Sequence, residues 1–154
     1  MTSGICSRAS RAVTVLFVDD DEDILFAYQL VATEGGMIVE LAHDGHEGIA
    51  LANLVSPDVI VLDIGLRSND GLDGFEVVRR LRASERTSSI PILIVSGSSS
   101  ARDQAAVRAS GCDAHLLKPC SAHELVELVT SLALRQRGDR AAPITGARAR
   151  LLAG

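Results

Sequence analysis

The chain is poor in cysteine and has no long apolar run, and these two shortages exclude several classes of protein. Its three cysteines, Cys6, Cys112 and Cys120, are odd in number and lack the spacing of a zinc site, so neither a disulfide framework nor structural zinc is expected. No apolar run approaches the ~18 residues that span a bilayer, and the first twelve residues lack the apolar core of a signal peptide. We therefore expect a cytoplasmic protein without membrane contact.

Positive charge is scarce in the middle of the chain. The sequence has 15 Lys and Arg against 20 Asp and Glu, but six arginines and only one acid, Asp139, lie in residues 1–12 and 136–154. The remaining segment has a net charge of −10, and such a segment binds nucleic acid poorly, because phosphates require clustered Lys and Arg. Lysine occurs once, at Lys118, which is therefore a candidate site residue.

The length and composition fit one folded domain. With 154 residues, 47% of them hydrophobic and 23% charged, the chain is close to an average globular domain and should bury a core. Residues 1–11 and 136–154 lack apolar periodicity. We therefore expect a domain at residues 12–135 between an N-terminal tail and a disordered C-terminal tail.

Five short runs of β-branched and aliphatic residues recur along this domain, at intervals long enough for a helix. Three of the runs are apolar throughout, which is typical of strands buried on both faces of a parallel sheet. The predicted strands are residues 13–18, 37–42, 58–62, 90–95 and 114–117.

The intervals between these runs have helical signals. Ile24, Tyr28 and Val31 share one face ahead of Gly35-Gly36, and Ser121 with Glu124 forms a capping box. Five β–α units in sequence predict a doubly wound α/β domain, with a parallel sheet between two helical layers. The predicted helices are residues 22–34, 45–54, 75–83, 101–110 and a last helix that follows Ser121.

Charged and polar residues stand where the predicted strands end. Asp19–Asp23 follows the first strand, Asp63 the third, Ser96 the fourth, and Lys118-Pro119 the fifth. Ligands of open α/β sheets bind beyond the carboxyl ends of the strands, so we expect these residues to converge. The resulting site would hold carboxylates, one hydroxyl and one ammonium group.

The carboxylates of Asp19, Asp20 and Asp63 would repel one another, so they need a compensating cation. An all-oxygen ligand set without His or Cys favours Mg²⁺ or Mn²⁺ over zinc. Lys118 adds a positive charge for an anion beside the metal. Together these groups suit the transfer of a phosphoryl group to a carboxylate.

Five motifs resemble those of the receiver domains of two-component response regulators. They occur in the family's order over about residues 13–133, and they are FVDDDEDI, SPDVIVLDIGL, DGFEVVRRLR, IPILIVSG and GCDAHLLKPCSAHEL. The resemblance implies a flavodoxin-like fold, a (βα)5 three-layer sandwich with five parallel strands in the order 2-1-3-4-5. It also implies that a histidine kinase or a histidine phosphotransfer protein supplies the phosphoryl group.

The resemblance assigns a role to each residue of the expected site. Asp63 is the phosphorylated residue. Asp20 and Asp63 bind Mg²⁺ together with the backbone carbonyl of Gly65. Asp19 acts through metal-bound water, and Lys118 contacts the phosphoryl group.

The resemblance further implies a conformational switch. Ser96 hydrogen-bonds the phosphoryl oxygens, and His115 occupies the position of an inward-turning aromatic residue, where it adds a proton equilibrium near neutral pH. The Lys118-Pro119 bond is expected to be cis, an isomer that only an X-Pro bond reaches at modest cost. Signalling, and a homodimer, would use the surface of the fourth helix, fifth strand and fifth helix.

The sequence departs from the family pattern in the loop after Asp63. Arg67 stands where proline is usual. The segment Asp73-Gly74-Phe75-Glu76 matches a family motif that normally begins three residues closer to the phosphorylated aspartate. We interpret this difference as a three-residue insertion in a loop that rims the site. Cys120, in place of an apolar residue after Lys118-Pro119, is interpreted as a packing change.

Several of these residues also have alternative interpretations. Asp21, Glu22 and Asp23 suit a helix N-terminus rather than a ligand set. A phosphatase of the haloacid dehalogenase type would use Asp19 and Asp21, but it leaves Asp63 without a role. Because 19 residues are too few for an output domain, we expect a stand-alone receiver that acts on its own phosphorylation and is not otherwise an enzyme. A phosphorylation-independent binding module and a receiver fragment of a hybrid histidine kinase remain open.

Overall fold

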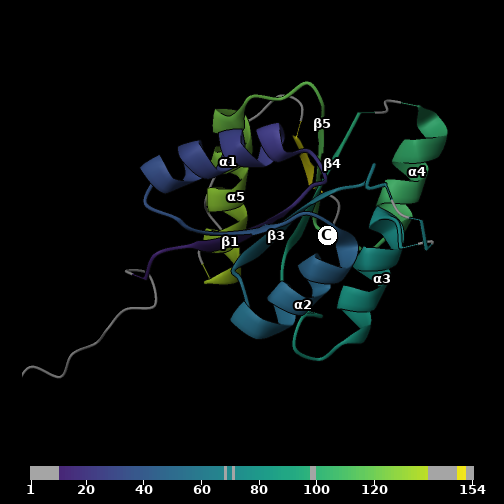
Figure 1. Cartoon of the computed structure of the whole chain (residues 1–154), viewed down its shortest axis with the longest axis horizontal. Coiled ribbons are helices and arrows are strands. Elements are labelled where there is room, and N and C mark those ends of the chain that lie inside the picture. The colour runs from purple at the N-terminus through teal and green to yellow at the C-terminus, as the bar shows by residue number, and fades with distance from the viewer. Residues whose placement is uncertain (1–10, 68, 71, 98–99, 139–148, 152–154) are drawn as a thin grey trace, which may run out of the picture.

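Strands and helices alternate along the chain (Figure 1). The computed structural model describes residues 11–67, 69–70, 72–97, 100–138 and 149–151. The strands are β1 (Thr14–Val18), β2 (Ile38–Ala42), β3 (Val59–Asp63), β4 (Ile92–Ser96), β5 (Ala114–Leu117) and β6 (Ala149–Leu151). The helices are α1 (Glu22–Glu34), α2 (Gly45–Val55), α3 (Gly74–Ala83), α4 (Ala101–Ala109) and α5 (Ala122–Gln136).

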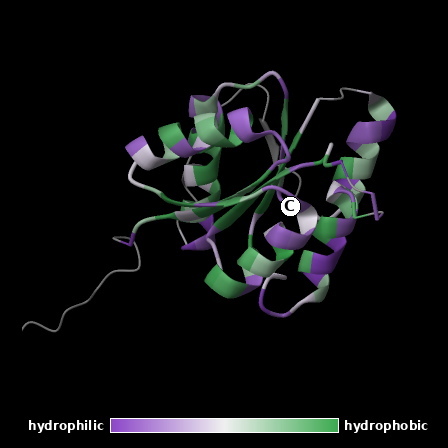
Figure 2. Cartoon of the chain, viewed as in Figure 1, coloured by the Kyte–Doolittle hydropathy of each residue, from purple (hydrophilic) through white to green (hydrophobic). Residues whose placement is uncertain are grey.

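The first five strands are parallel and lie in the order 2-1-3-4-5, as predicted. Helices α1 and α5 lie together on one side of the sheet, and α2 and α3 lie on the other (Figure 1). Helix α4 follows α3 on that second side, where its Val107 joins the same core. In β1, Val15 and Phe17 face the α1–α5 core, whereas Leu16 and Val18 face the other core. β1, β3 and β4 are therefore buried on both faces, and their largely apolar sequences lie in the green centre of Figure 2. β2, at the edge of the sheet, is partly exposed.

Each helix among the described residues begins at a side chain that accepts a main-chain hydrogen bond, which satisfies part of the first turn. Ser121 and Glu124 form the predicted capping box at α5. Gly36, just after α1, has a φ of +81°, the left-handed conformation that glycine adopts without strain. The N-caps are Asp21, Asp44, Asp73, Ser100 and Ser121.

The C-terminal segment differs from the expected disordered tail. Residues 149–151 form β6, which pairs antiparallel with β5 and extends the predicted five-stranded sheet to six. The backbone gives the reason: β5 would otherwise be an edge strand with unpaired N–H and C=O groups. The rest of the predicted tails, residues 1–10, 139–148 and 152–154, lies outside the described residues.

Just after α5, the side chain of Arg137 makes a contact that the sequence did not indicate. It donates to the main-chain oxygen of Arg11 and, at 3.1 Å, to the carboxylate of Asp58. These hydrogen bonds connect the end of α5 to the residues that precede β1 and β3. Among the described residues, no helix has the length and apolarity needed to cross a membrane.

Because the core is buried on both sides of the sheet, replacing a buried leucine by alanine should cost much more stability than replacing an exposed one. Leu93, on β4, has no exposed area, whereas the side chain of Leu54, on α2, is 77% exposed. We expect Leu93→Ala to lower the free energy of unfolding by about 2–5 kcal/mol, because it leaves a cavity in the core. Leu54→Ala, the control, should change it by less than about 0.5 kcal/mol. Urea unfolding monitored by circular dichroism measures both, and equal effects would contradict the assigned core.

Candidate functional site

Three carboxylates converge at the carboxyl ends of β1 and β3. Ligand oxygens of Asp19, Asp20 and Asp63 lie within 4.8 Å of one another. The ammonium nitrogen of Lys118, just after β5, lies 3.4 Å from Asp63 Oδ2 and 3.7 Å from Asp19 Oδ2. The structure therefore brings together the acids and the lysine that the sequence placed at separate strand ends.

Each of these carboxylates accepts a main-chain N–H. Asp19 Oδ1 accepts from the nitrogen of Asp21 at 2.9 Å, and Asp63 Oδ1 accepts from that of Gly65 at 2.9 Å. Asp20 Oδ2 accepts from the nitrogen of Arg67 at 3.3 Å. These donors fix the carboxylates and partly offset their negative charge.

Asp19 is the most deeply buried of the three carboxylates. Its side chain is almost fully buried, and this desolvation, together with the nearby charge of Asp63, raises the pKa of Asp19 from 3.8 to about 6. The hydrogen bond from Asp21 and the charge of Lys118 lower the pKa in part. A buried carboxyl with a raised pKa in a like-charged cluster is the setting in which a bound cation stabilises the ionised form.

The donor set fits a hard divalent cation. Its ligand atoms are carboxylate oxygens, and neither His nor Cys belongs to the group among the residues described. Asp20 is exposed and Asp63 is half-buried, so an ion has access from solvent. Magnesium in proteins is usually bound by one or two carboxylates and keeps several waters, which this arrangement allows.

Ser96 and His115, the two predicted switch residues, are in direct contact. Both are buried, and Ser96 Oγ lies 2.7 Å from His115 Nε2. The main-chain nitrogen of Lys118 donates to the carbonyl of Ser96 at 2.7 Å, which joins the ends of β4 and β5. The Lys118-Pro119 bond is cis, as predicted.

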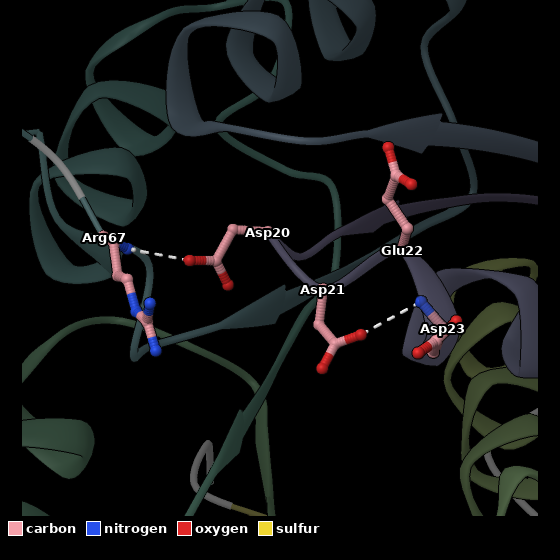
Figure 3. Close-up of a pocket in the computed structure, with 5 residues that line it drawn as sticks. All are labelled: Asp20, Asp21, Glu22, Asp23 and Arg67. Carbon is pink, nitrogen blue, oxygen red and sulfur yellow. Dashed lines mark hydrogen bonds between the residues drawn. The ribbon is translucent and has the colours of Figure 1, made fainter.

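An acidic pocket of about 420 Å³ opens beside these carboxylates. Figure 3 shows that Asp20 and Arg67 lie on one side of it and Asp21–Asp23 on the other. Asp21 is the N-cap of α1, and Glu22 and Asp23 form its first turn. The interpretation of these three acids as a helix N-terminus is confirmed.

The loop between β3 and α3, where the insertion is expected, packs against its surroundings. Leu66 and Leu72 are buried, and Asp70 Oδ2 lies 2.6 Å from His46 Nε2 at the start of α2. Sequence analysis missed this contact and the Arg67 hydrogen bond. A main-chain donor has no signature in the sequence, and residues 46 and 70 belong to different β–α units.

Among the described residues, the group that could hold a cation contains no histidine and no cysteine. His43 and His123 are exposed. Cys112 is buried, and burial raises the pKa of its thiol, which suits an inert side chain. Burial also raises the pKa of the Cys120 thiol, which is half-buried. Cys6 lies outside the described residues.

Comparison with known proteins decides the family. The family model of the response regulator receiver domain matches residues 15–130. The chain belongs to this family. The receiver domain covers β1 to most of α5, so it includes every site residue described above.

Relatives of this receiver domain include transcription regulators and chemotaxis proteins. The chain is 40% identical over 127 residues to the transcriptional regulatory protein PrrA of Mycobacterium leprae, which covers 82% of the chain and 52% of PrrA. The chain thus spans about half the length of the curated relatives it matches.

Among solved structures, the receiver domain of the Francisella response regulator 1452 superposes with a TM-score of 0.71 at 32% identity, over 80% of this chain and 98% of that one. The chemotaxis response regulator CheY4 of Vibrio cholerae superposes with a TM-score of 0.72 at 28% identity, over 79% of this chain and 99% of that one.

The raised pKa of Asp19 predicts how stability depends on pH in the absence of metal. A carboxyl with a higher pKa in the folded state binds protons more strongly when folded, so the free energy of unfolding falls as the pH rises from about 4 to above 6. We expect Asp19→Asn to raise the free energy of unfolding by about 1–3 kcal/mol at pH 7.5, and by little at pH 4.

Chemical unfolding in a metal chelator at the two pH values measures this effect. Asp23→Asn, an exposed acid in the first turn of α1, is the matched control and should change stability by less than about 0.5 kcal/mol. A loss of stability in Asp19→Asn at pH 7.5 would show that the buried charge is not unfavourable.

Proposed function

We propose that this receiver domain accepts a phosphoryl group on Asp63 from a phosphohistidine, in a reaction that requires Mg²⁺ or Mn²⁺. The observation that carries the proposal is the position of Lys118 Nζ, 3.4 Å from Asp63 Oδ2, within a cluster of three carboxylates. The side chain of Asp63 is 12% exposed, so one edge of its carboxylate is open to a donor.

The chemistry follows from the residues in place. A carboxylate oxygen of Asp63 attacks the phosphorus, the P–N bond to the donor imidazole breaks with its electron pair on nitrogen, and the ring, protonated at its other nitrogen, leaves as neutral imidazole. Gly65 N–H already holds the other carboxylate oxygen, Oδ1, so the attacking oxygen is oriented. Lys118 stands where it can neutralise the transferred phosphoryl oxygens.

A divalent cation bound by Asp20, Asp63 and the carbonyl of Gly65 would neutralise charge on the phosphoryl group, with Asp19 acting through a bound water. Gly65 suits this role because it is exposed and lies two residues after Asp63. The cation and Lys118 together offset a cluster whose members otherwise repel one another.

We infer that Ser96 and His115 couple phosphorylation to the molecular surface. In the structure the Ser96 hydroxyl is engaged with the His115 ring. If the Ser96 hydroxyl turns to hydrogen-bond a phosphoryl oxygen on Asp63, it leaves the His115 ring. His115 then changes its hydrogen-bond partner or its position. The affected surface is that of α4, β5 and α5, which we assign to a downstream protein target.

The remaining assignments complete the proposal. The donor is a histidine kinase or a histidine phosphotransfer protein, and we place this protein in the cytoplasm. The domain promotes its own phosphorylation and dephosphorylation and is not an enzyme in the usual sense. We propose output through a separate protein. PrrA is longer, since the match covers only 52% of it, and an output segment joined to the receiver is the alternative that its length supports.

Intact-mass spectrometry with acetyl phosphate and Mg²⁺ tests the central assignment. We expect the wild-type protein to gain one phosphoryl group, and Asp63→Asn to gain none, because the amide is not a nucleophile toward phosphorus. Asp70→Asn, a nearby acid in the same loop, is the matched control and should still be phosphorylated. Phosphorylation of Asp63→Asn would contradict the assignment. If the wild-type protein neither binds Mg²⁺ nor becomes phosphorylated, the phosphorylation-independent binding module is favoured.

A further inference from the structure

The loop after β3 reaches back to the end of β1 through one main-chain hydrogen bond. The nitrogen of Arg67, four residues after Asp63, donates to Asp20 Oδ2 at 3.3 Å (Figure 3). The two residues are 47 positions apart in the sequence, so this bond joins two different β–α units.

The three site carboxylates differ in where their main-chain donors come from. Asp19 and Asp63 each accept from the residue two positions later, so their orientation is fixed locally. Asp20 accepts from the β3–α3 loop instead. Asp20 is also the most exposed of the three, and water can compete for its oxygens. Its orientation therefore depends on the position of the loop.

A donor that holds one carboxylate oxygen leaves the other available to a cation. Groups that hydrogen-bond a metal ligand fix its orientation, and they reduce the conformational entropy that is lost when the ion binds. Arg67 can do this through its backbone. Proline, which is usual at this position in the pattern described above, has no N–H and cannot donate.

We propose that Arg67 is a positioning residue, whose main-chain N–H holds the Asp20 carboxylate in the orientation in which it ligates the divalent cation. The proposal rests on the proposed function, in which Asp20 is a metal ligand. The guanidinium group contributes separately, since it places positive charge in the pocket that the acids line. A test must therefore separate the N–H from the side-chain charge.

Two substitutions make this separation. Arg67→Ala removes the guanidinium and keeps the N–H, whereas Arg67→Pro removes both. Isothermal titration calorimetry with MgCl₂ alone measures the affinity of both variants. We expect Arg67→Pro to bind Mg²⁺ about three- to tenfold more weakly than Arg67→Ala. This loss of affinity is small for a residue that supports a metal ligand, because the hydrogen bond is exposed and long. Equal affinities of the two variants would overturn the proposal. If the wild-type protein binds no Mg²⁺, the proposed function and this inference both fail.

A second measurement does not depend on proline or on the metal. In the metal-free protein, the Arg67 amide proton should resonate downfield and exchange slowly with solvent. Asp20→Ala should move it upfield and speed its exchange at least threefold, and Glu22→Ala, an exposed acid of the same pocket, should not. An Arg67 amide that is unchanged by Asp20→Ala would overturn the proposal while leaving the phosphorylation of Asp63 unaffected.

Discussion

The repulsion among three carboxylates at one end of the sheet is the constraint on which the site depends. Parallel strands bring Asp19, Asp20 and Asp63 together, because the carboxyl ends of β1 and β3 lie side by side. The fold meets the cost with a single lysine and with one main-chain donor for each carboxylate. Burial of Asp19 adds to this cost and raises the pKa of its carboxyl to about 6. A cluster with this excess of negative charge is prepared for a cation and for a phosphoryl group beside Lys118.

This electrostatic arrangement is supported by an ordinary two-sided core. Alternate residues of each central strand enter the two helical layers, so the sheet is fixed on both faces and its strand ends are held in register. Ser96 is the last residue of β4, and Lys118 follows β5 directly, so the rigid scaffold holds Lys118 Nζ 3.4 Å from Asp63 Oδ2. The contact between Ser96 and His115 joins β4 to β5.

Most of the fold and the composition of the site could be predicted from the sequence, because both leave local signals. The apolar runs and capping residues located the helices and the first five strands to within about two residues, and the polar strand ends located the site. Three features had no such signal. β6 has only three residues, the Arg67 donor belongs to the backbone, and the contact between His46 and Asp70 joins different units of the chain. These features depend on tertiary placement, which periodicity does not contain.

In the proposed reaction, Asp63 itself becomes the acyl phosphate. Borohydride reduction of the protein after incubation with a phosphodonor and Mg²⁺, followed by peptide mapping, tests this directly, because the hydride converts an aspartyl phosphate to homoserine. We expect homoserine at position 63 and unmodified aspartate at positions 19 and 20. Homoserine at either of those positions, or none at position 63, would contradict the proposed reaction.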